Sequence, residues 1–163
     1  MAEREIPATL TDIICPTISG VDSDTRLLKV TVDSKKSRKN AVDKLGKYFS
    51  LEVLHESHES GEVYEDYDYS DRTDFLWLHP EATISPEFSI PCIGACCFIH
   101  DGGNPKTFSL HWVWIHPYWR RQRLLENALP EFHKQFGDFD IISPLSPEMQ
   151  QFVKKHNLEN NVV

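Results

Sequence analysis

The chain has 163 residues, of which 40% are hydrophobic and 26% are charged, and its formal net charge is −8. This length and composition predict one globular domain with its own core, and 7 Gly and 10 Pro without periodicity exclude a collagen-like chain. The sequence contains no run of about 18 apolar residues, so we expect no membrane span.

The first 25 residues predict an N-terminal arm without regular structure, because Pro7, Pro16 and Gly20 interrupt any helical or strand pattern. The charged start of this arm lacks the apolar segment of a secretory signal. We therefore expect a cytoplasmic protein rather than an exported one.

The pattern becomes regular after the arm. Residues 27–33 alternate partly and are rich in β-branched side chains, which predicts a strand. Ser34 is suited to cap a helix over residues 35–49, whose apolar side chains follow helical spacing. We expect a short strand over residues 49–55.

Charge is distributed unevenly between two neighbouring stretches. Residues 26–47 carry eight bases against two acids, whereas residues 52–74 carry nine acids against Arg72 alone. Such runs are most often a solvated helix face and a solvated loop. The functional alternative is that the acidic stretch attracts a cationic substrate or partner and that Lys35–Lys39 contact nucleic acid. The acidic chain has no recognised nucleic-acid motif, which argues against the second of these.

From residue 88 onward the elements are sharper. Residues 88–100 and 108–116 predict two strands of a hairpin, residues 120–136 a helix, residues 139–143 a strand and residues 147–156 a last helix. This order predicts an α/β fold with a mixed sheet flanked by helices. An antiparallel hairpin leads into a right-handed parallel β-α-β crossover.

The change from antiparallel to parallel neighbours in this sheet is a natural place for a cleft. We expect one of Trp112 and Trp114 to pack in the core and the other to line that cleft. His116, at the end of the same strand, is interpreted as scaffold beside the cleft rather than as a base.

Four cysteines are present, and three of them, Cys92, Cys96 and Cys97, lie in or beside one apolar run. We expect buried thiols in a reducing compartment rather than disulfides. Neither their spacing nor that of His55 and His58 supplies a zinc ligand set, so we expect no metal.

The most informative segment is Val113–Leu125, with the sequence Val-Trp-Ile-His-Pro-Tyr-Trp-Arg-Arg-Gln-Arg-Leu-Leu. It resembles the segment of the GNAT family of N-acetyltransferases in which a strand ends in a hydrophobic-His-Pro-like step and R/Q-x-x-G-x-G/A opens a helix. Arg120 matches the first Arg/Gln, whereas Arg123 and Leu125 stand in place of the small residues. The element order over residues 88–158 also follows the family.

The resemblance implies that the protein binds acetyl-CoA as a co-substrate. Backbone groups of Trp114 and Ile115 would pair with the pantetheine arm, and amides from Arg121 to Leu125 would hold the pyrophosphate, as helix N-termini hold anions. An arginine of this segment would reach the 3′-phosphate. The implied cofactor-binding residues are Trp114, Ile115, Arg120, Arg121, Gln122, Arg123, Leu124 and Leu125.

The resemblance also implies direct attack of an amine on the thioester, with an acid that protonates the leaving thiolate. Many family members use a Tyr on the last helix, where this chain has Phe152 and His156 but no Tyr. A looser resemblance to the C-terminal half of cohesin-type acetyltransferases favours a Ser. Ser143 and Ser146 are therefore the candidate catalytic residues.

We expect one GNAT-like domain over residues 1–163. It would consist of an arm (1–25), a variable part (26–87) that contains the acidic stretch, and an acetyl-CoA-binding core (88–158).

Our first hypothesis is transfer of an acetyl group to an amine of a small molecule or a protein, cationic if the acidic stretch attracts it. The alternative is a GNAT-shaped binding or regulatory module without catalysis that acts through protein–protein interaction. Arg123, Leu125 and the missing Tyr would allow that alternative. A protein-interaction domain of unrelated fold is a third possibility.

Overall fold

The computed structural model describes residues 13–22, 25–54, 71–100, 107–143 and 145–163. Its elements, in chain order, are β1 (Thr17–Ile18), β2 (Leu27–Val30), α1 (Lys36–Phe49), a π-helical turn (Ser50–Leu54), β3 (Arg72–Leu78), β4 (Ile90–His100), β5 (Phe108–Ile115), a 3-10 turn (Pro117–Trp119), α2 (Leu124–Phe136), β6 (Phe139–Ile141), α3 (Pro147–Lys155) and a second 3-10 turn (Glu159–Asn161).

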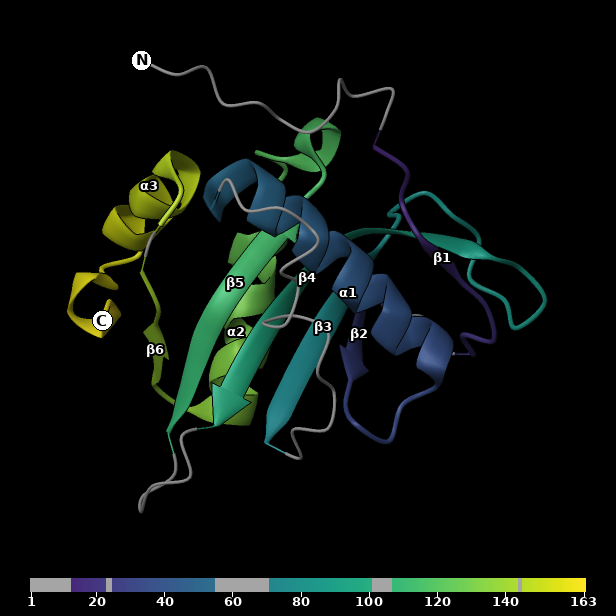
Figure 1. The fold of residues 1–163 in the computed structure, drawn as a ribbon, viewed down its shortest axis with the longest axis horizontal. Helices are drawn as coiled ribbons and strands as arrows, with labels where there is room; N and C mark the ends of the chain where they lie inside the picture. The colour runs from purple at the N-terminus through teal and green to yellow at the C-terminus, as the bar shows by residue number, and fades with distance from the viewer. Residues whose placement is uncertain (1–12, 23–24, 55–70, 101–106, 144) are drawn as a thin grey trace.

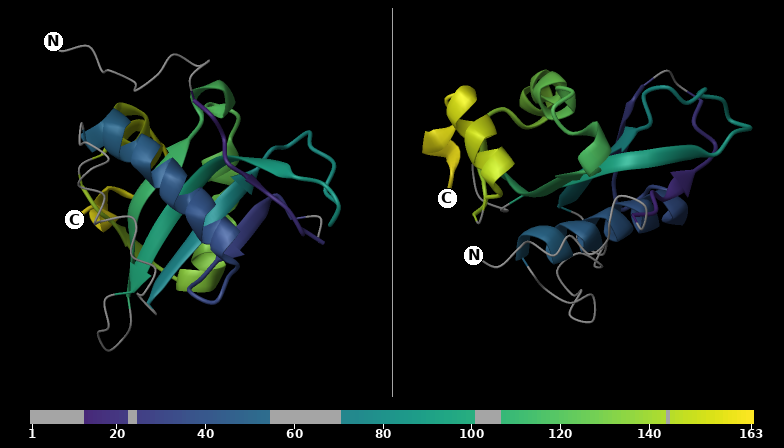
Figure 2. Two further views of the ribbon diagram at one scale, coloured as in Figure 1. Left: turned by 45° about the vertical axis from the view of Figure 1, so that its right-hand side comes forward. Right: turned by 90° about the horizontal axis from the view of Figure 1, so that it is seen from above.

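The described strands form one six-stranded mixed sheet in the order β2-β3-β4-β5-β6, with β1 pairing to β4. All these pairings are antiparallel except that of β5 with β6, which α2 connects as a parallel crossover. Helix α1 covers one face of the sheet, and α2 lies on the other (Figures 1 and 2). The predicted fold class is confirmed.

The core between α1 and the sheet contains both strand tryptophans. Trp112 stacks on Phe49 at a ring-centroid distance of 5.9 Å, and Trp114 stacks on Tyr48 at 5.3 Å. Both tryptophans are buried. Residues two apart in a strand point to the same face, so both tryptophans face α1. The expectation that one packs in the core and the other lines a cleft still holds, because Trp114 also lines the cleft described below and Trp112 does not.

Phe132 is the centre of the core on the opposite face. Its fully buried ring meets those of Phe75, Phe98 and Trp77 at centroid distances of 5.2, 4.9 and 6.2 Å. Tilted and edge-on ring pairs of this kind stabilise a core beyond the area that they bury. They fix α2 across the sheet and thereby the place where α2 begins.

Two local predictions before the acidic stretch are wrong. Ser34 does not cap α1, because its hydroxyl accepts the amide hydrogen of Thr31 at 2.9 Å and Lys35 is the N-cap residue. Residues 50–54 are π-helical rather than extended. Tertiary contacts of Glu52, described below, fix this turn against the local preference for a strand.

The prediction of a solvated loop over residues 52–74 fails at both of its ends. Glu52 and Asp74 are buried, and Arg72 donates from Nε to the two carboxylate oxygens of Asp74 at 3.1 and 2.9 Å. A second carboxylate, that of Asp43 on α1, lies 3.7 Å from Arg72 Nη2. Residues 55–70, which carry most of the acids together with His55 and His58, lie outside the described residues.

The prediction that the three strand cysteines are buried is confirmed, whereas a reducing compartment stays a prediction. All four cysteines are free, and Cys92, Cys96 and Cys97 are buried in the sheet. Burial raises the pKa of Cys92 to about 12 and that of Cys96 and Cys97 well above the usual thiol value. These thiols are therefore protonated and unreactive at neutral pH.

No helix among the described residues combines the length and apolar character that crossing a bilayer requires.

We predict that Phe132→Ala lowers the free energy of unfolding by about 3–5 kcal/mol, because it removes the ring on which α2 and the sheet converge. Urea unfolding followed by circular dichroism measures this loss. The control is Phe88→Ala, since Phe88 is 52% exposed and its removal should change stability by less than about 0.5 kcal/mol. Equal losses for the two variants would contradict this account of the core.

Candidate functional site

A cleft opens where the two parallel strands separate. β5 and β6 pair only over Phe108–Leu110 and Phe139–Ile141, after which β6 ends and β5 continues to Ile115. The register of β4 and β5 shifts between Cys97 and Phe98, which leaves His111 as an extra residue on β5. Beyond this bulge lies a cleft of about 470 Å³ between β5, the start of α2 and one face of α3.

The edge of β5 presents backbone groups to this cleft. The amide of His116 donates to the carbonyl of Ile93 on β4 at 2.7 Å. Since backbone direction alternates along a strand, Trp114 also faces β4, whereas Val113 and Ile115 face the cleft. If the predicted strand-like contact with pantetheine exists, the groups of β5 that could make it are those of Val113 and Ile115, not those of Trp114. Trp114 still lines the cleft through its side chain.

The loop between β5 and α2 adopts a backbone that usually needs glycine. Arg121 and Arg123 have φ angles of 65° and 62°, in the left-handed region. This conformation costs a non-glycine residue of the order of 1 kcal/mol or more and persists only where the surroundings fix it. It also corrects our prediction of a helix from residue 120, because α2 begins only at Leu124.

The first turn of α2 directs free amides at the cleft. Its first helical hydrogen bond runs from the amide of Asn127 to the carbonyl of Arg123 at 2.8 Å. The amides of Leu124, Leu125 and Glu126 precede it and, within the described structure, have no backbone acceptor. These three residues line the cleft. Free amides at the positive end of a helix dipole form an anion site.

Cationic side chains surround this helix start. Arg121, Arg123 and Lys155 line the cleft, the last from α3. The carboxylate of Glu126 lies 3.8 Å from Arg123 Nε and 3.5 Å from Lys155 Nζ, distances of loose and partly exposed ion pairs. His156 Nε2 is 3.7 Å from the same carboxylate. Apart from Glu52 and Arg120, the cleft lining carries the cations of Arg121, Arg123 and Lys155 against the carboxylates of Glu126 and Glu148, so positive charge exceeds negative charge by one.

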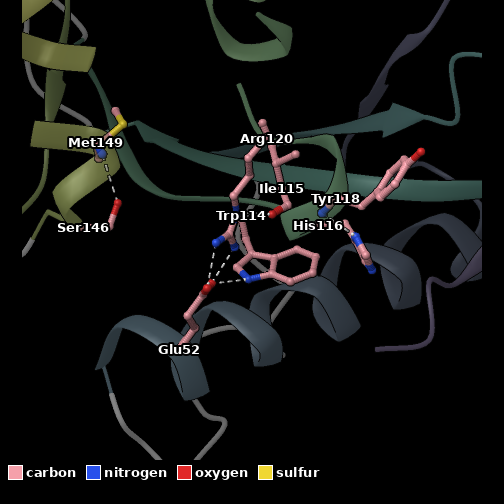
Figure 3. Close-up of polar contacts among 8 residues, drawn as sticks. All are labelled: Glu52, Trp114, Ile115, His116, Tyr118, Arg120, Ser146 and Met149. Carbon is pink, nitrogen blue, oxygen red and sulfur yellow. Dashed lines mark hydrogen bonds and ion pairs between the residues drawn. The ribbon is translucent and has the colours of Figure 1, made fainter. Parts of the chain in front are cut away.

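Arg120 does not belong to that cationic group. Its guanidinium binds the carboxylate of Glu52 through both terminal nitrogens, at 2.8 and 2.6 Å, and its Nε donates to the carbonyl of Ile115 at 2.7 Å (Figure 3). The indole of Trp114 donates to Glu52 Oε2 at 2.8 Å. The Glu52 side chain is only 4% exposed. In this structure, the guanidinium of Arg120 is therefore held by Glu52 and the carbonyl of Ile115.

Sequence reasoning missed Glu52, although its setting gave a signal. It is the lone charge in the segment Ser50–Leu54, between apolar residues. A charged side chain in such a segment must find a partner if the segment is buried. Nothing in the sequence indicates that this partner is Arg120, 68 positions away.

The remaining predicted site residues divide into those that reach the cleft and those that do not. Ser146 lines the cleft, whereas Ser143 is exposed and does not. Gln122 is exposed, and its side-chain amide donates to the carbonyl of Tyr118 at 3.3 Å. Leu124 and Leu125 line the cleft beside their free amides.

His116 serves as scaffold. Its Nδ1 accepts the amide hydrogen of Tyr118 at 3.1 Å and so caps the 3-10 turn after β5 (Figure 3). Burial and the nearby Arg120 lower the pKa of His116, so its imidazole is neutral at pH 7. A neutral ring with Nδ1 as acceptor keeps its proton on Nε2.

Within the described part of the chain, no group of three His, Cys, Asp or Glu side chains is arranged to hold a metal ion. The absence of a resident metal stays a prediction, because His55 and His58 lie outside the described residues.

Comparisons with known proteins bear on the fold. No family model matches the chain, and no curated protein matches it. Among solved structures, the xEco2 acetyltransferase domain bound to a CoA conjugate matches with a TM-score of 0.55 and 10% identity, over 80% of this chain and 86% of that chain.

Two further solved structures are similar at lower scores. A GNAT-family acetyltransferase from Streptococcus pneumoniae TIGR4 has a TM-score of 0.49 and 13% identity, over 82% of this chain and 86% of that one. An aminoglycoside acetyltransferase from an uncultured soil metagenomic sample, in complex with sisomicin, has 0.48 and 11%, over the same shares of 82% and 86%. The chain thus has the fold of the GNAT acetyltransferases, as the resemblance predicted.

Ser146 caps α3, because its hydroxyl accepts the amide hydrogen of Met149 at 3.1 Å. We predict that Ser146→Ala lowers the free energy of unfolding by about 1 kcal/mol and that Ser146→Asp, which preserves the cap, does not. Urea unfolding of the three proteins measures both effects. Identical stability for the Ala variant and the wild type would contradict the capping role.

Proposed function

We propose that this protein binds acetyl-CoA in the cleft between β5 and α3 and transfers the acetyl group to an amine. The observation that carries the proposal is the coincidence of three features in one cleft. These are an unpaired edge of β5, the free amides of the first turn of α2, and an excess of cationic side chains beside those amides. The GNAT fold supports it, because its members include acetyltransferases.

The residues that would hold the co-substrate follow from this arrangement. The edge of Val113 and Ile115 would pair with the amide-containing pantetheine arm as a neighbouring strand does. The amides of Leu124–Glu126 would bind the pyrophosphate at the helix start. Arg121, Arg123 and Lys155 would supply cations for the phosphates. Arg123 and Lys155 can follow a ligand because their ion pairs with Glu126 are loose.

Acetyl-CoA would supply an activated thioester, whose carbonyl carbon forms a bond to the amine nitrogen while its bond to sulfur breaks. The amine proton leaves to a base, and the departing thiolate takes a proton from an acid. Of the two predicted acids, only Ser146 lines the cleft. Its oxygen accepts from Met149, which leaves the hydroxyl hydrogen available, so we retain Ser146 and not Ser143 for this role.

We also propose one domain rather than a cofactor core with a separable N-terminal part. Glu52, from the segment 26–87, lines the same cleft as residues of the segment 88–158. Both faces of one sheet are covered by helices from the two segments (Figure 2). The cationic nature of the acceptor and a cytoplasmic location stay predictions.

A module without catalysis is the second candidate, and one observation favours it. Arg123 and Leu125 occupy positions where the family has small residues, and both side chains line the cleft. Their bulk would then fill the space in which phosphates approach the backbone. Binding of acetyl-CoA discriminates between the two candidates.

We predict that acetyl-CoA at about 100 times its dissociation constant stabilises the protein by about 2.7 kcal/mol and raises the melting temperature by several degrees. Thermal shift with acetyl-CoA, and with ATP as a polyanion control, measures this. Acetylation of an amine panel under the same conditions then tests transfer. No shift at millimolar acetyl-CoA would favour the module without catalysis.

The variant Arg123→Gly separates the two possible roles of this loop residue. Glycine accepts a φ of 62° without strain, so the variant should be at least as stable as the wild type. If backbone amides carry most of the binding, we expect its affinity for acetyl-CoA to fall by no more than about fivefold, a loss typical of one exposed charge contact. Calorimetric titration measures the affinity, with Lys154→Gln as the control on the exposed side of α3. Loss of all binding in Arg123→Gly would contradict the amide assignment.

A further inference from the structure

The contact between Glu52 and Arg120 joins two parts of the chain that lie on different elements. Glu52 is in the π-helical turn after α1, and Arg120 opens the loop that leads from β5 to α2. Both line the cleft. Each carboxylate oxygen of Glu52 accepts a guanidinium hydrogen, and Oε2 also accepts the indole hydrogen of Trp114 (Figure 3). The carboxylate is thus buried and accepts three hydrogen bonds, two of them from a cation.

Arg120 makes two kinds of contact at once, and their directions matter. The two terminal nitrogens bind Glu52, while Nε binds the carbonyl of Ile115 at 2.7 Å. The guanidinium is a rigid planar fork, so fixing it at both sides fixes the peptide groups that it joins. One of these is the cleft-facing carbonyl at the end of β5. The other is the backbone of Arg120 itself, which immediately precedes the left-handed Arg121.

We propose that Glu52 is a positioning residue of the cleft, which holds Arg120 as a strut between the π-helical turn after α1, the end of β5 and the loop of residues 121–123. Arg120 in this role contacts no phosphate, and the loop cations Arg121 and Arg123 do. The expected effect of Glu52 on acetyl-CoA affinity rests on the proposed function. Its expected effect on the rigidity of the loop in the free protein does not.

Two energetic arguments favour a strut over a phosphate ligand. Moving Arg120 to a phosphate would leave the buried Glu52 carboxylate without its cation, which is among the costliest changes in a protein interior. A buried pair contributes little net stability compared with apolar packing, so its value lies in geometry. The left-handed conformations of Arg121 and Arg123 persist only if the surrounding structure fixes the backbone. The contacts of Arg120 fix the residue that directly precedes them.

The first experiment uses the free protein. Amide hydrogen exchange, read by mass spectrometry, compares the wild type with Glu52→Gln and Arg120→Lys. Lysine keeps the charge of Arg120 but lacks the fork, and this conservative variant is expected to fold even if Glu52→Gln does not. We expect exchange of residues 116–123 to accelerate about tenfold or more in both variants while the sheet keeps its protection. Unchanged exchange in this segment would overturn the proposal, whether or not the protein binds acetyl-CoA.

The second experiment is a double-mutant cycle on acetyl-CoA affinity. We expect Glu52→Gln and Arg120→Lys each to weaken binding about tenfold, and the double variant to be no weaker than either, because both remove one strut. The control cycle pairs Glu52→Gln with Arg121→Gln, whose effects should multiply. High salt should reduce the loss caused by Arg121→Gln, since exposed charges are screened, but not that caused by Arg120→Lys.

The opposite pattern identifies a phosphate ligand. If Glu52→Gln strengthens binding or leaves it unchanged while Arg120→Gln abolishes it and Arg120→Lys retains it, Arg120 contacts phosphate and the proposal is overturned. If the wild type binds no acetyl-CoA, the proposed function fails, and the exchange experiment alone decides the positioning role.

Discussion

The cleft exists because the parallel strands β5 and β6 pair over only three residues and then separate. Beyond Leu110 and Ile141, β5 has no strand on its outer edge. Buried backbone groups without partners are costly, so an edge of this kind is tolerated only where solvent, a ligand or a side chain satisfies it. Arg120 donates a hydrogen bond to one of these groups, the carbonyl of Ile115. The rest of the unpaired edge of β5 lines the cleft. The start of α2 lies beside this edge because the parallel connection must place it there.

Two buried ionic units support the sheet, and they differ in their position. Arg72 with Asp74 and Asp43 lies between β3 and α1, whereas Glu52 with Arg120 and Trp114 lies at the cleft. The first joins Asp43 of α1 to Arg72 and Asp74 of β3, and the second joins Glu52 of the turn after α1 to Trp114 of β5 and to Arg120 in the loop that follows. Because a buried carboxylate must be paired, these acids restrict how the N-terminal part can pack on the sheet. The acidic stretch therefore has a structural function at its two ends, in addition to whatever residues 55–70 do.

The loop between β5 and α2 has a backbone conformation that usually requires glycine, although arginines occupy it. The family pattern places small residues where this chain has Arg123 and Leu125. Arg121 and Arg123 nevertheless adopt the left-handed backbone that glycine favours. In our proposal, the strut of Arg120 offsets part of the free-energy cost of this conformation. Of these two residues, Arg123 adds a cation to the cleft and Leu125 adds an apolar side chain, while the free amides of the helix start are retained.

Local patterns in the sequence predicted the hairpin and the parallel crossover that follows it, and they placed the helices 35–49 and 147–156 to within a residue or two, because hydrophobic periodicity and turn residues act over short distances. They also pointed to the segment Val113–Leu125. They did not predict the strands β1 and β3. Only the tertiary structure decided that β5 and β6 separate after Leu110, that α2 begins at Leu124 and that Glu52 binds Arg120. These features depend on which backbone edge stays unpaired and on a contact between residues 68 positions apart, and neither leaves a periodic trace in the sequence. The strand predicted over residues 49–55 failed for the same reason, since the partner of Glu52 outweighs local propensity.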